Sequence, residues 1–342
     1  MKPFENLFFE LVGSCNAKCH WCVTGGGSEY VPPKSFVDVE RFAQVLDYYL
    51  QRGVIDCDTI VYLFSWGEPT LHPDFNKIIR LLNDRQLGFG LSTNASLPIN
   101  LESESMSNLK AMTISMPGFS QSSYDKVHGF KIEKILINID KILTDLKEAG
   151  FKKKVKLAFH VYQFNLLEIR SAIRHFSTRN VQFVPYLAYV NDYNRSVAYL
   201  KKTLPADEMY KLSQELLLYY VDDLISAQPA DWQCPQWDVL NLDENCNVIN
   251  CCSVPKGHED YRICSALELD SETLKSIKRK SSICTECMTT GSAYWGHNVE
   301  IVEKLVNQLD NNFLRGLSRE IRSQTKAAKR KLRSILKPLV SR

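Results

Sequence analysis

Three cysteines near the start of the chain are the residues best suited to chemistry. Cys15, Cys19 and Cys22 stand at the spacing C-x3-C-x2-C. Thiolates are soft ligands that suit zinc, copper and iron–sulfur clusters. A structural zinc ion or an iron–sulfur cluster usually takes four protein ligands. Three thiolates on a four-iron cluster therefore leave one iron open, and an open iron can bind a substrate or cofactor.

A second polar group follows the next strand-like segment. Gly67-Glu68-Pro69 comes shortly after the largely apolar residues 59–65. The Glu68 carboxylate can accept a charge-assisted hydrogen bond from an ammonium group. Gly67 permits close backbone approach, and Pro69 fixes the turn. The motif therefore predicts a turn that binds a positively charged group of a ligand.

Three further candidates stand at the ends of later strand-like segments. Asn94 and Ser115 belong to the ends of the third and fourth segments, and His160 lies near the end of the fifth. Their side chains suit the carboxylate and hydroxyl groups of a ligand. Asn and Ser also favour turns for local reasons, and a lone histidine in an apolar strand is often a core residue. Both interpretations stay open at this stage.

The elements that position these residues alternate between strand-like and helix-like from residue 5 to about residue 226. Repeated strand–helix units predict an α/β protein with a parallel sheet and helices outside it. Six units fit a partial TIM-like (β/α)6 barrel, in which reactive residues sit on the loops after the strands. We expect strands at 5–12, 59–65, 88–93, 111–116, 154–162 and 181–189, and helices at 38–52, 73–85, 131–149, 166–176 and 205–226.

Three domains are expected: a barrel at 1–226, a cysteine-rich auxiliary domain at 227–290 and a helical, basic tail at 291–342. Seven of the eleven cysteines fall within 227–290. Residues 311–342 carry ten Lys or Arg and one acid, a net +9 against +3 for the whole chain, so the remainder is at −6. We expect the tail to dock as a helix on the barrel. Peripheral contact of residues 315–342 with an anionic membrane is the alternative.

Composition limits the class of protein. The hydrophobic content of 44% is enough for a core. The sequence has no run of about 18 apolar residues, so it predicts no membrane-spanning helix. The first residues do not read basic and then apolar, as a secretory signal does, so we expect a cytoplasmic protein. In that compartment eleven cysteines indicate metal or redox chemistry rather than disulfides.

The cysteine loop, with Trp21 in the aromatic place before Cys22, resembles the signature of the radical S-adenosylmethionine (SAM) superfamily. The resemblance implies a [4Fe–4S] cluster whose open iron binds the amino and carboxylate groups of SAM. The cluster reduces SAM, and a 5′-deoxyadenosyl radical takes a hydrogen atom from substrate. Gly67, Glu68 and Pro69 resemble the family's motif for the amino group of SAM.

The same resemblance assigns Asn94 and Ser115 to the carboxylate and ribose of SAM, with His160 as a further candidate on the cofactor side. One departure concerns Met116 and Pro117, because relatives often carry Asp after the corresponding Ile-Ser. A contact to ribose or substrate is therefore expected to be lost or replaced there.

The second group of cysteines resembles the SPASM/twitch extension of this superfamily. The resemblance implies one auxiliary [4Fe–4S] cluster on Cys234, Cys251, Cys284 and Cys287, so that the protein holds two clusters besides SAM. Cys252 can replace Cys251, because spacing does not separate adjacent cysteines. A structural zinc ion on the same thiols is the alternative.

Relatives with a single auxiliary cluster act on small polar molecules such as aminocyclitols and sugars. The resemblance thus implies oxidation, dehydrogenation or rearrangement of a sugar- or cyclitol-like substrate, with electrons from a flavodoxin or ferredoxin and no nucleic-acid partner. Tyr189, Asp192 and Arg195, after the sixth strand, are candidate substrate contacts. The alternatives are a SPASM-type enzyme that modifies peptides or proteins, and a non-catalytic metal-binding adaptor.

Overall fold

The computed structural model describes residues 2–19, 22, 24, 34–99, 106–188, 190 and 192–297. They all belong to the first of two compact units, which spans residues 1–298; the second unit, residues 299–342, lies outside the described residues. The predictions for Trp21, Tyr189 and residues 298–342 of the basic tail also lie outside the described ranges. Within the described ranges, no helix is long and apolar enough to cross a membrane.

A nine-stranded sheet runs through the described residues in the order β6-β5-β4-β3-β2-β1-β7-β8-β9. The pairs from β6 to β1 and from β1 to β7 are parallel, and β7, β8 and β9 pair antiparallel. The strands are β1 (Asn6–Phe9), β2 (Ile60–Tyr62), β3 (Gly88–Thr93), β4 (Leu109–Met116), β5 (Val155–Val161), β6 (Val181–Leu187), β7 (Leu240–Leu242), β8 (Asn247–Ile249) and β9 (Arg262–Ser265).

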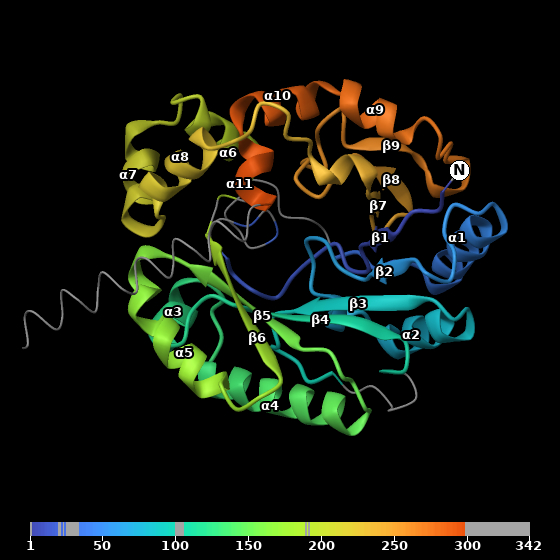
Figure 1. Cartoon of the computed structure of the whole chain (residues 1–342), viewed down its shortest axis with the longest axis horizontal. Helices are drawn as coiled ribbons and strands as arrows, with labels where there is room; N and C mark the ends of the chain where they lie inside the picture. Colours follow the sequence, from blue (N-terminus) through green and yellow to red (C-terminus); the bar gives the residue numbers. More distant parts are fainter. Residues whose placement is uncertain are drawn as a thin grey trace, which may run out of the picture. The chain divides into compact units, whose positions relative to one another are not determined.

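Helices α4 and α5 lie along the outer side of the sheet, and α9 and α10 lie beside β7 to β9 (Figure 1). The predicted α/β class with a parallel sheet is confirmed. The helices are α1 (Val39–Gln51), α2 (Phe75–Asp84), α3 (Gln121–Lys126), α4 (Ile132–Glu148), α5 (Ile169–Phe176), α6 (Tyr193–Leu200), α7 (Ala206–Glu215), α8 (Leu218–Ser226), α9 (Leu274–Lys280), α10 (Ser282–Thr290) and α11 (Ser292–His297), with the short 3-10 turns η1 (Pro69–Leu71), η3 (Gln163–Glu168), η4 (Pro235–Asp238) and η5 (Ala266–Glu268).

Local sequence explains how α1 begins and where it packs. The side chain of Asp38 accepts a hydrogen bond from Arg41 N and so caps the first turn. Apolar residues at helical spacing form the buried face. On that face, the ring of Phe42 lies 4.7 Å from the ring of Phe9 in β1. The first strand, which leads into the cysteine loop, is thereby anchored to its covering helix.

The helix expected at 205–226 is two helices, α7 and α8. The break falls at Leu216, which is extended, with φ −93° and ψ 150°. The Gln163 side chain donates to Leu216 O at 2.6 Å and to Ser213 O at 2.7 Å. A side chain from η3 therefore donates hydrogen bonds to the carbonyl groups at the end of α7. The apolar stripe in the sequence does not reveal this break between the two helices.

The cysteine-rich region is joined to the barrel through the sheet itself. β7 lies beside β1, with Leu7 paired to Leu240, and Glu10 N donates to Leu242 O at 2.9 Å. This pairing carries the sheet across the predicted boundary at 226/227, and the boundary stays a prediction. It also fixes the second group of cysteines relative to the strand that precedes the first group.

Candidate active site

A cavity of about 390 Å³ lies at the carboxyl ends of the parallel strands. It brings the cysteine loop, the Gly-Glu turn and the strand-end residues together. Pro69, the first residue of η1, is not among the residues that line the cavity. Of the predicted site residues, those that line the cavity are Cys15, Cys19, Cys22, Gly67, Glu68, Asn94, Ser115 and His160.

The cysteines of this loop are partly buried, and the loop is hydrogen-bonded. Cys22 N donates to Cys19 O at 3.2 Å, and Asn94 Nδ2 donates to Cys15 Sγ at 3.6 Å. Burial raises the pKa of Cys15 to about 12 and also raises the pKa of Cys19. Such thiols give up their protons readily only to a bound metal, so the loop suits metal thiolates better than free nucleophiles.

The turn at Gly67 packs directly against the cysteine loop. Glu68 N donates to Ser14 O at 3.1 Å. A Cβ atom at Gly67 would lie 1.8 Å from Val12 O, so this close approach requires glycine. The two predicted motifs therefore form one continuous wall of the cavity.

Glu10, which no motif in the sequence singles out, holds this wall together. Its carboxylate, 2% exposed, accepts hydrogen bonds from Trp66 N and from Gly67 N, the latter at 3.2 Å. Burial raises the pKa of Glu10 to about 7, and the two backbone donors act against that rise. Glu10 comes at the end of the first strand, whereas the turn that it holds follows the second strand. The sequence contains no pattern that connects the two.

Glu68 is buried and has donors on both carboxylate oxygens. Oε1 accepts from Thr70 N at 3.2 Å, from Thr70 Oγ1 at 2.7 Å and from Thr93 Oγ1 at 2.8 Å. Oε2 accepts from Asn94 N at 2.8 Å. Burial raises the pKa of Glu68, and these donors oppose the rise. Since a carboxylate offers about four lone-pair sites, two on each oxygen, Oε2 keeps the capacity to accept from a ligand.

The far wall carries neutral polar groups. Ser115 comes from β4 and His160 from β5, and burial lowers the pKa of His160 to about 4. His128, which precedes Gly129 in a loop, also lines the cavity, and burial lowers its pKa to about 3. Both imidazoles are therefore neutral near pH 7.

Two polar atoms in the lining fit a bound ligand. Among the described residues, Ser65 Oγ and His128 Nδ1 are buried without a hydrogen-bond partner. Buried polar groups nearly always have partners, so unpaired ones in a cavity wall favour a polar ligand there. The donor set, three thiols with a buried carboxylate beside them, fits an iron–sulfur cluster with SAM.

Asp192 and Arg195 lie at the start of α6 and are not among the residues that line this cavity. The Asp192 side chain caps the helix by accepting from Arg195 N at 3.0 Å. Arg195 Nε donates to Glu208 Oε2 at 3.2 Å. These contacts give both residues structural roles, and their contact with substrate stays a prediction.

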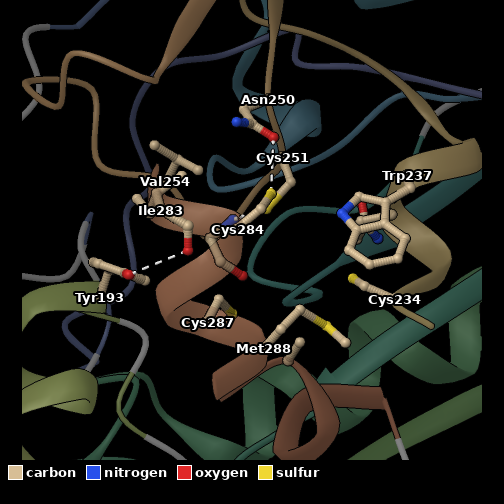
Figure 2. Close-up of a pocket in the computed structure, with 13 residues that line it drawn as sticks. Tyr193, Cys234, Trp237, Asn250, Cys251, Val254, Ile283, Cys284, Cys287 and Met288 are labelled. Atoms are coloured by element: carbon tan, nitrogen blue, oxygen red, sulfur yellow. Dashed lines mark hydrogen bonds between the residues drawn. The ribbon is translucent and has the colours of Figure 1, made fainter. Parts of the chain in front are cut away.

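A second, smaller cavity of about 30 Å³ is lined by four of the predicted ligands, Cys234, Cys251, Cys284 and Cys287. Figure 2 shows them around one space, with Cys284 and Cys287 on α10. Residues three apart on a helix share a face, so α10 presents both thiols to the cavity. In the described part of the chain, no three His, Cys, Asp or Glu side chains are gathered closely enough to hold a single metal ion.

The two adjacent cysteines differ. Cys251 lines the second cavity, and its Sγ accepts from Ser253 N at 3.2 Å; Cys252 is not part of that lining. A hydrogen bond from the Cys252 thiol lowers the pKa of Cys251, so Cys251 ionises first of the two. The arrangement favours Cys251 as the ligand.

Three thiols and a buried acid line one cavity at the carboxyl edge of a parallel sheet, so the fold is that of an α/β protein whose cavity suits a metal–thiolate cofactor. Residues 9–174 match the sequence profile of the Radical SAM superfamily. The chain therefore carries a radical SAM domain, as the cysteine loop and the Gly-Glu-Pro turn predicted. This family implies a [4Fe–4S] cluster and SAM.

Two named proteins illustrate the similarity in sequence. The chain is 25% identical over 227 residues to the GTP 3',8-cyclase of Aquifex aeolicus, a match that covers 64% of this chain and 67% of the cyclase. It is 24% identical over 212 residues to AlbA, the antilisterial bacteriocin subtilosin biosynthesis protein of Bacillus subtilis, a match that covers 60% of this chain and 44% of AlbA.

Among solved structures, the fold is similar to that of Streptococcus suis SuiB bound to the precursor peptide SuiA. The TM-score is 0.56 at 14% identity, over 89% of this chain and 74% of SuiB. This likeness concerns the fold, and it confirms the predicted partial barrel with a cysteine-rich region after it.

Proposed function

We propose that the protein is an enzyme that holds a [4Fe–4S] cluster on Cys15, Cys19 and Cys22, binds SAM beside it and removes a hydrogen atom from a substrate. When bound, the cluster and SAM supply the 5′-deoxyadenosyl radical that abstracts the hydrogen. The observation that carries the proposal is the shared cavity, in which the three thiols meet the Glu68 carboxylate.

The chain's own residues bind and orient the cofactor. The remaining acceptor site on Glu68 Oε2 suits the ammonium group of SAM. Gly67 leaves room for ligand next to the backbone, and the Glu10 carboxylate keeps the turn in place through two N–H groups. Asn94 and Ser115 offer amide and hydroxyl groups to the carboxylate and ribose of SAM.

Reductive cleavage of SAM tests this proposal. Reduced, anaerobically reconstituted protein is expected to form 5′-deoxyadenosine and methionine. Replacing Cys15, Cys19 and Cys22 together by Ala should abolish the products, because the open-iron site is lost. The matched control is Cys57→Ala, since Cys57 is exposed. Undiminished cleavage in the triple variant refutes the assignment, and absence of cleavage by the reconstituted parent protein would favour the non-catalytic adaptor instead.

A second [4Fe–4S] cluster is proposed for Cys234, Cys251, Cys284 and Cys287, in the twitch form of the SPASM extension. The support is the cavity that these four thiols share and the presence of an iron–sulfur signature in the same chain. When bound, it supplies one-electron redox chemistry. The reconstituted protein should hold about eight irons, and the triple variant about four. Zinc in place of iron in the triple variant supports the structural alternative.

For the substrate, we favour a small sugar-bearing molecule that is oxidised or rearranged. The cyclase relative is named for an action on GTP, which contains ribose. The hydroxyl and neutral imidazole groups around the cavity suit hydrogen bonds to sugar hydroxyls. Electrons are proposed to come from a flavodoxin or a ferredoxin.

A peptide substrate is the second candidate, because AlbA is named for bacteriocin biosynthesis and the SuiB structure contains its precursor peptide. Deuterium transfer separates the two. A panel of deuterated sugars, nucleotides and peptides is incubated with protein and SAM, and the label in 5′-deoxyadenosine is measured by mass spectrometry. Label that comes only from peptides rejects the sugar proposal.

A further inference from the structure

Lys278 is a buried cation that the proposed reaction leaves without a role. Its side chain in α9 is 0% exposed. Its Nζ donates to Gln236 O at 3.0 Å and to Val239 O at 2.6 Å. A buried ammonium is costly unless it is paired, and two neutral carbonyl groups compensate that cost only in part. A negative partner is therefore expected close by.

The second cavity supplies that partner. Gln236, whose carbonyl group accepts from Lys278 Nζ, lines this cavity together with Cys234, Cys251 and Cys284. The positive charge of Lys278 favours the thiolate forms of these three cysteines, although burial raises the pKa of Cys234 and of Cys284 on balance. Burial is the largest influence on Lys278 itself and lowers its pKa to about 8, whereas the neighbouring thiols act in the opposite direction. The cation and three of the four proposed ligands thus share one desolvated region.

Backbone contacts fix the position of this charge. Gln236 lies in η4, which starts directly after Cys234. Ser281 Oγ, which accepts from Cys284 N at the start of α10, donates to Lys278 O at 2.9 Å. Lys278 thereby connects the segment that carries Cys234 with the helix that carries Cys284. A charge fixed so tightly acts on the site without first having to reorganise.

We propose that Lys278 is a positioning residue that sets the reduction potential of the second cluster by fixing one positive charge beside it. The inference rests on the proposed second cluster. One-electron reduction adds a negative charge to a cluster already held by thiolates. A nearby fixed cation stabilises the reduced state more than the oxidised state, and net charge is a main determinant of such potentials. Lys278 thus makes the second cluster a better electron acceptor.

The neutral variant Lys278→Gln tests the charge. Its amide nitrogen still offers two donors to the carbonyl groups, whereas Lys278→Arg keeps the charge. The matched control is Lys275→Met on the same helix, because Lys275 is partly exposed and pairs with Asp238 at the surface. All three are made in the Cys15, Cys19, Cys22 triple-Ala background, where only the second cluster titrates, and the potential is measured by EPR-monitored redox titration.

We expect Lys278→Gln to lower the equilibrium constant for reduction of the second cluster about tenfold. For a one-electron couple this lowers the reduction potential by about 59 mV. Lys278→Arg should shift it much less, and Lys275→Met should leave it unchanged. An unchanged potential in Lys278→Gln overturns the inference. If Lys278→Gln loses its iron, retention of iron in Lys278→Arg supports the role of the positive charge. Equal loss of iron in both variants overturns the inference and shows that Lys278 acts through its hydrogen bonds to the backbone. Zinc or no iron in the parent background instead rejects the proposed cluster itself.

Discussion

Replacing Glu68 by Gln tests whether this carboxylate binds the ammonium group of SAM. In the structure, three donors reach Oε1, and Asn94 N reaches Oε2. Gln keeps the shape of the side chain but has one carbonyl oxygen and one NH2 group. In either orientation the NH2 group faces at least one of these donors, and the negative charge is gone.

The magnitude follows from these contacts. A lost hydrogen bond to a charged group is worth roughly 1.5–3 kcal/mol. Since about 1.4 kcal/mol is tenfold in affinity, we expect SAM to bind roughly ten- to a hundredfold more weakly. The internal donor left unpaired should also lower the free energy of unfolding by about 1–3 kcal/mol. Calorimetric titration of the reconstituted protein with SAM measures the affinity, and chemical denaturation measures the stability.

Glu168→Gln is the matched control. Glu168 also accepts several internal hydrogen bonds, from Phe119 N, Ser120 Oγ and Ser123 Oγ, but it is not part of the cavity lining. This variant should lose stability and keep its affinity for SAM. Unchanged SAM affinity in Glu68→Gln, or an equal loss of affinity in both variants, would refute the assignment of Glu68.

Two further predictions concern the turn beside the cysteine loop. Gly67→Ala should strongly weaken SAM binding in calorimetry, because the new Cβ meets Val12 O at 1.8 Å, whereas Gly257→Ala has no atom within 4 Å to meet and should bind SAM normally. Equal affinities would contradict the close packing. For Glu10, burial raises the folded-state pKa from 4.5 to about 7, so the folded state holds the proton more tightly and stability falls as pH rises through this window, by about 3 kcal/mol. Glu10→Gln removes this loss, so its unfolding free energy relative to the parent should rise from pH 5 to pH 8. Parallel pH profiles for the parent and Glu10→Gln would disprove the assignment.

Much of the candidate site was predictable because its residues stand in short motifs at strand ends. A loop with three cysteines, a Gly-Glu-Pro turn, and Asn94 and Ser115 at the ends of successive strands must meet at one edge once the sheet is parallel. The structure places Cys15, Glu68 and Asn94 in one cavity, as that argument requires. Alternation of strands and helices was enough to predict the sheet itself.

The remaining features depend on contacts between distant segments. β7 pairs with β1 across more than 200 residues, and no local pattern specifies such a partner. Glu10 ends an apolar strand, and His128 stands in a loop, so neither shows in the sequence that it reaches the cavity. Lys278 stands among other basic residues, where a solvated face is the ordinary expectation, yet it is fully buried. The sequence does not distinguish the adjacent Cys251 and Cys252, whereas the structure does, because only Cys251 lines the second cavity.

The EPR spectrum of the reduced, reconstituted protein before and after addition of SAM tests the central claim most directly. The account predicts that SAM changes the signal of the cluster on Cys15, Cys19 and Cys22, because it binds the open iron beside Glu68. The signal that remains in the triple-Ala variant should not respond to SAM. A parent spectrum that SAM leaves unchanged, or a response that persists in the triple-Ala variant, would contradict the account.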